Sequence, residues 1–139
     1  MIDSRDVTLN MHSVQTMGKH RDEQKRQCRG KWFLRDGINV VKYRDEDSGT
    51  IDTMELYTRR VRLRRSGAIN AEMEFTAGGS SLFDMATELG TFDFLVRTTR
   101  VAVGIFEDHL SVALAYDLYA DGALVSHNHV DYEVVLCEE

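Results

Sequence analysis

The sequence predicts an all-β protein folded as a single antiparallel barrel of about eight to ten strands, with little helix. Apolar and polar residues alternate along most of the 139 residues, and no window gives a convincing helical stripe. Glycines interrupt this alternation at short intervals. A barrel is the favoured architecture because closure removes the exposed edges that so many strands would otherwise carry. The length suits one domain, residues 1–139, with one core.

The N-terminal half is expected to contain strands around residues 7–11, up to residue 34, at 38–47 and around 61–63, each with apolar side chains at every second position. Asp36-Gly37 is expected to connect the second of these to the third. Asp-Gly is a preferred dipeptide for the tight turn of a β-hairpin.

The C-terminal half is expected to add strands at residues 69–76, 92–97, 110–119 and 128–136. Asp121-Gly122 predicts a tight turn between the last two. At residues 98–101 the apolar phase moves from even to odd positions, which predicts a β-bulge or a short turn. Residues 80–87, "SSLFDMAT", fit one helical turn, a short strand or a loop.

Composition excludes several functions. The net charge of −6 opposes binding to nucleic acid or to anionic membranes, so we expect neither as a partner. No stretch approaches the roughly 20 apolar residues that span a bilayer, and the start of the chain does not resemble a signal peptide. We therefore expect a cytoplasmic protein whose two cysteines, Cys28 and Cys137, are free thiols, although one disulfide remains conceivable.

An ordered set of residues from position 65 onward matches a known family. It comprises Arg65-Ser66-Gly67, Met73-Glu74-Phe75, a glycine at 78 or 79, Thr87-x-x-Gly90, Thr98, Leu114-x-Tyr116-x-Leu118 and a closing strand with Asn128. This pattern resembles the YwiB-like family of bacterial proteins, a domain of unknown function. The resemblance implies a calycin-type, lipocalin-like barrel in the bacterial cytoplasm and no established activity. Met85 and Glu88-Leu89 depart from the tyrosine and Pro-Tyr that the family tends to carry there.

The stretch "SHNHVDYE" contains His127, His129, Asp131 and Glu133 at alternate positions, so all four share one face of a strand. Two imidazoles and a carboxylate could bind zinc or another transition metal, with His127, His129 and Asp131 as the candidates. The opposite phase is apolar and should face the interior, which places the histidine row in solvent. We therefore expect no metal and no cofactor.

The stretch "TRRVRLRR" places arginines at positions 59, 60, 62, 64 and 65. Basic strands of small barrels can contact nucleic acid, usually together with aromatic residues. Here Val61 and Leu63 separate the arginines, and we expect the outward-facing ones to pair with neighbouring carboxylates such as Glu72 and Glu74. Arg65 differs because it shares the apolar phase, so it should point inward to a carboxylate, a carbonyl or an anionic ligand.

The barrel interior is the main candidate site for a ligand. Its expected lining residues are Arg65, Trp32, Met73, Phe75, Thr98, Tyr116 and Asn128. Eight-stranded barrels lie at the limit between filled and hollow, and a cavity above about 300 Å³ would favour ligand binding. A filled core with an apolar outer patch, for which Tyr119 and Leu95 are candidates, would favour a protein-interaction module or homodimer.

Catalysis finds no support in the sequence, so we do not expect an enzyme, although a hydrolase or isomerase at the barrel mouth remains a third hypothesis. "GGSS" fits a turn, and the carboxylates of "RDEDSG" are expected in a solvated loop. Cys28 lies between Arg26 and Arg29, which are expected to lower the pKa of its thiol. The sequence therefore indicates a ligand carrier or sensor, with the interaction module as the alternative.

Overall fold

The computed structural model describes residues 4–137, which form ten strands and no helix. The strands are β1 (Arg5–Met17), β2 (His20–Arg35), β3 (Ile38–Asp45), β4 (Thr50–Leu56), β5 (Arg60–Gly67), β6 (Asn70–Thr76), β7 (Ser80–Thr87), β8 (Gly90–Ile105), β9 (His109–Ala120) and β10 (Ala123–Leu136). Consecutive strands pair antiparallel, and β1 pairs with β10 to close the barrel. The predicted all-β barrel is thus confirmed, and residues 80–87 are a strand rather than a helical turn.

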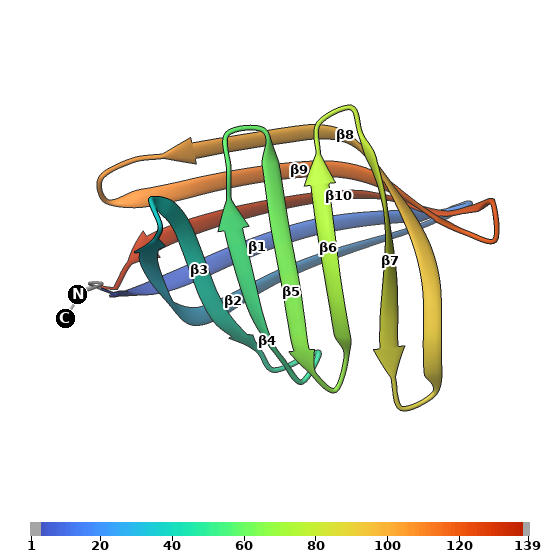
Figure 1. Ribbon diagram of the computed structural model, residues 1–139, viewed down its shortest axis with the longest axis horizontal. Coiled ribbons are helices and arrows are strands. Elements are labelled where there is room, and N and C mark those ends of the chain that lie inside the picture. Colours follow the sequence, from blue (N-terminus) through green and yellow to red (C-terminus); the bar gives the residue numbers. More distant parts are fainter. Residues whose placement is uncertain (1–3, 138–139) are drawn as a thin grey trace.

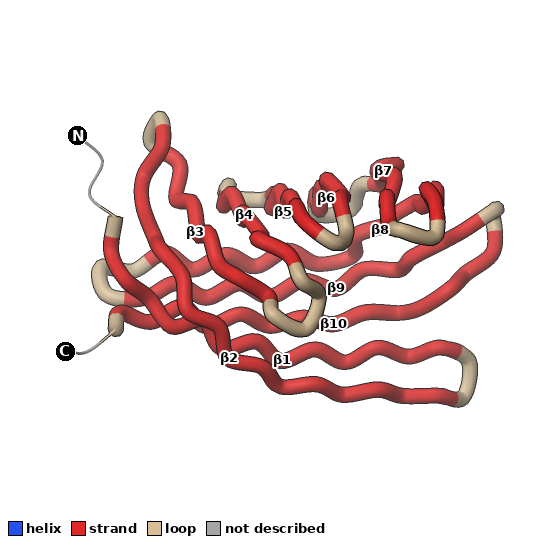
Figure 2. The backbone as a smooth tube through the Cα atoms, turned by 90° about the horizontal axis from the view of Figure 1, so that it is seen from below, coloured by secondary structure: helices blue, strands red, loops and turns tan. Residues whose placement is uncertain are grey.

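Two groups of strands cross around the interior. Figure 1 shows the long strands β1, β2, β8, β9 and β10 along the length of the molecule, with β3 to β7 running across them. Figure 2 shows β4 to β7 lying above the long strands, while the β1–β2 and β9–β10 hairpins project beyond β7 at one end. The largest fully buried side chains of the core cluster lie in the interior: Trp32, Tyr43, Phe75, Leu9, Met54, Leu110, Val7, Val41, Val61, Val96 and Val112.

Two of the tight turns follow the predicted Asp-Gly dipeptides. Asp36 and Gly37 have φ values of 52° and 80°, and Asp121 and Gly122 have 52° and 77°. Positive φ at both central positions is the signature of a type I′ hairpin turn, whose twist matches that of the flanking strands. These turns fix the registers of the β2–β3 and β9–β10 hairpins.

Two β-bulges change which side chains face inward. The register between β8 and β9 shifts between Thr98 and Arg100, which confirms the bulge predicted from the change of apolar phase. A second shift, which the apolar pattern does not predict, lies between Leu124 and Ser126 on β10. Leu124 therefore faces outward opposite Tyr119, whereas Ser126 is buried.

Two of the seams between strands are incomplete. Pairing between β2 and β3 begins at Gly30 and Tyr43, so residues 20–29 of β2 pair with β1 alone. Between β6 and β7 the ladder has two pairs, Asn70 with Ala86 and Ala71 with Met85. These gaps leave room for side chains, rather than backbone, to line part of the interior.

Candidate functional site

Arg65 lies near the end of β5 and points into the barrel, as its phase with Val61 and Leu63 predicts. Its Nη2 lies 3.5 Å from Oδ2 of Asp52 and 3.8 Å from Oδ2 of Asp45, and its Nη1 donates to Ser48 Oγ at 3.3 Å. Internal carboxylates are therefore the partners of this arginine, one of the alternatives expected from the sequence.

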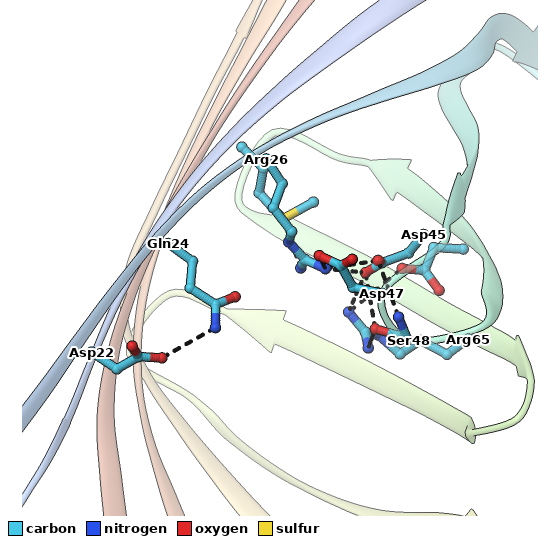
Figure 3. Close-up of polar contacts among 9 residues, drawn as sticks. Asp22, Gln24, Arg26, Asp45, Asp47, Ser48 and Arg65 are labelled. Atoms are coloured by element: carbon cyan, nitrogen blue, oxygen red, sulfur yellow. Dashed lines mark hydrogen bonds and ion pairs between the residues drawn. The ribbon is translucent and has the colours of Figure 1, made fainter.

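A second arginine enters the same region from β2. Nη1 of Arg26 donates to both carboxylate oxygens of Asp45, at 2.7 and 2.9 Å. Ser48 also donates to Asp45, through its hydroxyl at 3.0 Å and its backbone N–H at 3.3 Å. Figure 3 shows Arg26 and Arg65 meeting at Asp45. We call Arg26, Arg65, Asp45 and Asp52 the arginine–aspartate cluster.

The pKa values of the two carboxyl groups in the cluster shift in opposite directions. Burial alone would raise the pKa of Asp45, but Arg26 and the hydrogen bonds from Ser48 outweigh it and leave the pKa below its ordinary value. Burial raises the pKa of Asp52, and Arg65 offsets this only in part. Two arginines and two aspartates leave the cluster formally neutral, with no surplus positive charge.

Three tyrosines surround the cluster on the inner face. Burial raises the pKa of Tyr43, Tyr116 and Tyr132, so all three remain neutral phenols at physiological pH. Tyr43 Oη and Arg65 Nε are buried without a hydrogen-bond partner among the described residues, and Asp52 is held by its ion pair with Arg65 rather than by a hydrogen bond. Buried polar atoms are usually paired with protein, water or ligand. The interior therefore retains unused hydrogen-bonding capacity.

A cavity of about 280 Å³ adjoins this polar region. One wall is apolar and is formed by Met11, Leu63, Met73, Phe75, Phe83, Met85, Leu114, Leu118 and Val130. Arg26, Arg65, Tyr116, Tyr132 and Asn128 provide polar atoms along the lining. Asp22 and Gln24, from the projecting part of β2, also line the cavity and are exposed, so this end opens to solvent. Figure 3 shows both side chains apart from the cluster.

The lining includes most of the residues expected from the sequence. Arg65, Met73, Phe75, Tyr116 and Asn128 all border the cavity.

Trp32 and Thr98 are buried but lie outside the cavity lining. The indole Nε1 of Trp32 donates to Asn39 Oδ1 at 2.8 Å, and the Arg5 guanidinium lies 3.8 Å from the ring centroid. Trp32 therefore belongs to the filled part of the core.

Arg26, Asp45 and Asp52 were missed by the sequence interpretation. The expectation that the "RDEDSG" carboxylates lie in a solvated loop is wrong for Asp45, whose exposure is 1%. Its inward direction could have been inferred from the shared phase with Tyr43, because β3 continues to Asp45. The charged residues on both sides of Asp45 are typical of a loop, which is why the end of the strand was interpreted as one.

The histidine row faces outward as predicted. His127, His129, Asp131 and Glu133 are exposed, while the alternate side chains of β10 are buried or half-buried. Nδ1 of His127 lies 2.5 Å from Oδ1 of Asp117, so one histidine already has a carboxylate partner. Within residues 4–137, no group of three or more potential ligands is placed to hold a metal ion.

Two outward-facing arginines of β5, Arg60 and Arg62, pair with acidic residues of β6, as expected. Nη1 of Arg60 lies 3.3 Å from Oε1 of Glu74, and Arg62 pairs with Glu72 in the neighbouring register position. The charges of Arg60 and Arg62 are therefore matched by carboxylates on the outer face of the sheet.

Both cysteines are free thiols. The expectation that neighbouring arginines lower the pKa of Cys28 is wrong. Burial raises that pKa, and Asp45 adds to the effect, while Arg26 lowers it only in part. Arg26 turns toward Asp45 and is largely neutralised there, so its charge is not available to stabilise a thiolate.

The chain is thus a closed ten-stranded antiparallel β-barrel that contains an internal ion-pair cluster and a small open cavity. The family model described as "Domain of unknown function (DUF1934)" matches residues 9–131, and the chain belongs to that family. The crystal structure of the ywiB protein from Bacillus subtilis is similar, with a TM-score of 0.89 and 16% sequence identity over 97% of this chain and 94% of that chain. That similarity supports the fold, and the resemblance to YwiB-like proteins is confirmed.

No curated protein matches the sequence. Within the part of the chain that the structure describes, no helix has the length and apolar character needed to cross a membrane.

Proposed function

We propose that this protein binds a small, uncharged and mainly apolar molecule in the barrel interior. The supporting observation is the open cavity of about 280 Å³ between an apolar wall and the arginine–aspartate cluster. Ligand sites typically combine a concave apolar surface with a few polar groups that fix orientation. The cavity combines these two features in a single space.

The size of the cavity limits the ligand. The cavity volume of about 280 Å³ lies just below the threshold of about 300 Å³ that would favour ligand binding. That threshold is the lower end of the usual range of about 300–1,000 Å³ for drug-sized molecules. An apolar cavity of about 150 Å³ can nevertheless hold benzene. A molecule the size of one substituted ring is therefore the appropriate scale.

The charges of the cluster determine the polar end of the ligand. Asp45 already receives two hydrogen bonds from Arg26, and Asp52 forms an ion pair with Arg65. Arg65 and the neutral hydroxyls of Tyr116 and Tyr132 are donors on the lining, and they favour a hydrogen-bond acceptor. A carboxylate would enter a neutral cluster without a free cation, which is unfavourable. We therefore expect a carbonyl, amide or hydroxyl oxygen at this end.

Ligand-observed NMR with benzamide and benzoate tests this proposal. The two probes share one ring and differ in head-group charge. We expect saturation transfer to benzamide, and roughly tenfold weaker binding of benzoate because its charge would be buried without a partner.

Leu118→Trp fills the cavity from its lining, whereas Leu89→Trp makes the same substitution at a residue that is 90% exposed. The L118W variant should lose the benzamide signal and L89W should keep it. Absence of binding by the wild-type protein, or equal binding by L118W and L89W, would overturn the proposal. Stronger binding of benzoate would overturn the uncharged head group.

A further inference from the structure

A row of apolar side chains crosses four neighbouring strands on the outer face. The registers align Leu82 of β7 with Leu95 of β8, Leu95 with Tyr119 of β9, and Tyr119 with Leu124 of β10. Leu82 is 82% exposed and Leu124 is 47% exposed. Leucine at such exposure contributes little to the core, so this row is not explained by folding.

A row of acidic residues runs beside the apolar row, two residues further along the strands. Asp84 of β7 lies directly opposite Asp93 of β8, and Asp121 follows in the adjacent β9–β10 turn. Like charges opposite one another destabilise a sheet. The hydrogen bond and the charge of Asp84 raise the pKa of Asp93. A cation placed here would relieve the repulsion.

The two rows share one depression in the surface. A groove of about 380 Å³ is lined by Leu82, Asp93, Phe94, Leu95, Arg97, Tyr119, Asp121 and Gly122. Arg97 stacks over the Tyr119 ring at 5.3 Å and lies opposite Asp117 in the register. Arg97 supplies one positive charge to the lining against the two carboxylates of Asp93 and Asp121, so the groove keeps a net negative charge.

We propose that this groove binds a short extended segment of a partner protein in which an apolar side chain lies beside a lysine or arginine. The apolar part would cover Leu82, Leu95 and Tyr119, and the cation would lie between Asp93 and Asp121. Four strands at the usual spacing span about 14 Å, which four or five extended residues can cover. The groove lies on the outer face and is separate from the interior cavity.

Selection from a phage-displayed library of short random peptides tests this inference, with the full-length protein as bait. Enriched peptides should combine an aliphatic or aromatic residue with an adjacent lysine or arginine. A resynthesised peptide should bind roughly tenfold more weakly to Leu82→Ser and to Asp93→Asn. Its affinity for the wild-type protein should fall as salt concentration rises. Leu89→Ser is the matched control, because Leu89 is 90% exposed and lies outside the groove.

Absence of enrichment, enrichment of acidic peptides, or unchanged binding by L82S and D93N would each overturn the inference. Sedimentation of the wild-type protein as a dimer that L82S dissociates would also overturn it, because the occupant would then be a second copy of the chain. Both substitutions lie at exposed positions, so loss of fold should not obscure the result.

Discussion

Replacing Arg65 by methionine should destabilise the barrel by about 3–5 kcal/mol, because removal of one partner leaves a buried charge uncompensated. Asp52 is completely buried, and Arg65 is its ion-pair partner at 3.5 Å. The same substitution at Arg62 is the matched control on the same strand. Its ion pair with Glu72 is exposed, and exposed pairs contribute about 0–1 kcal/mol.

The loss of unfolding free energy caused by R65M should depend on pH. Burial already raises the pKa of Asp52, and loss of Arg65 should raise it further. A carboxyl group whose folded pKa exceeds its unfolded pKa contributes stability at low pH that is lost as pH rises through the folded pKa. The R65M variant should therefore be closest to the wild type under mildly acidic conditions and should fall further behind toward neutral pH.

Urea unfolding followed by the fluorescence of the single tryptophan, Trp32, measures these differences. The double variant R65M/D52N should lose less stability than the sum of the two single variants, with a coupling of about 1–3 kcal/mol. Equal losses for R65M and R62M, or strict additivity in the double variant, would refute the argument that the Arg65–Asp52 pair is energetically coupled within the core.

Three further predictions concern the backbone, the core and the free thiols. Gly67→Ala should cost more than about 2 kcal/mol, because the φ of Gly67 is 138° and an added Cβ would lie 2.5 Å from the Gly49 carbonyl oxygen. Gly78→Ala, with φ of 77° and open space, should cost only about 1 kcal/mol in the same unfolding assay, and equal losses would contradict this. Met54→Ala should cost about 2–5 kcal/mol of unfolding free energy since Met54 is fully buried, and a loss below 1 kcal/mol would show that the site collapses. Cys28 should react with iodoacetamide more slowly than a fully exposed cysteine at neutral pH, and its rate should increase as pH rises, because its pKa is raised. Mass spectrometry of the modified peptide measures this rate. Rapid alkylation at neutral pH would contradict the raised pKa.

Alternation was enough to predict the barrel because its strands are long and one face of each is apolar. Leu110, Val112 and Leu114 illustrate this, because all three are buried, whereas the residues between them, Ser111 and Ala113, are only half-buried. The bulge after Thr98 was also visible, because an inserted residue changes the phase of the pattern that follows. The bulge at Leu124–Ser126 was not visible, because the adjacent apolar residues Leu124 and Val125 fit either phase.

The candidate site was predictable only where its residues belong to apolar runs. Arg65 was found because it continues the phase of Val61 and Leu63. Asp45 shares its phase with Tyr43, and Asp52 shares its phase with Met54 and Leu56, so strand phase indicates their inward direction but not their partners, Arg26 and Arg65. A single sequence does not reveal which charges meet in space, because ion pairs between strands depend on register rather than on local pattern.

Native mass spectrometry of the protein purified from the organism that encodes it tests the central claim most directly. We expect a noncovalent adduct of one small molecule on the wild-type protein, and this molecule should be uncharged when released. The adduct should be absent from the cavity-filled L118W variant and retained by the surface variant L89W. A bare wild-type mass, or an adduct of equal occupancy on L118W, would contradict the claim that the barrel interior is a binding site.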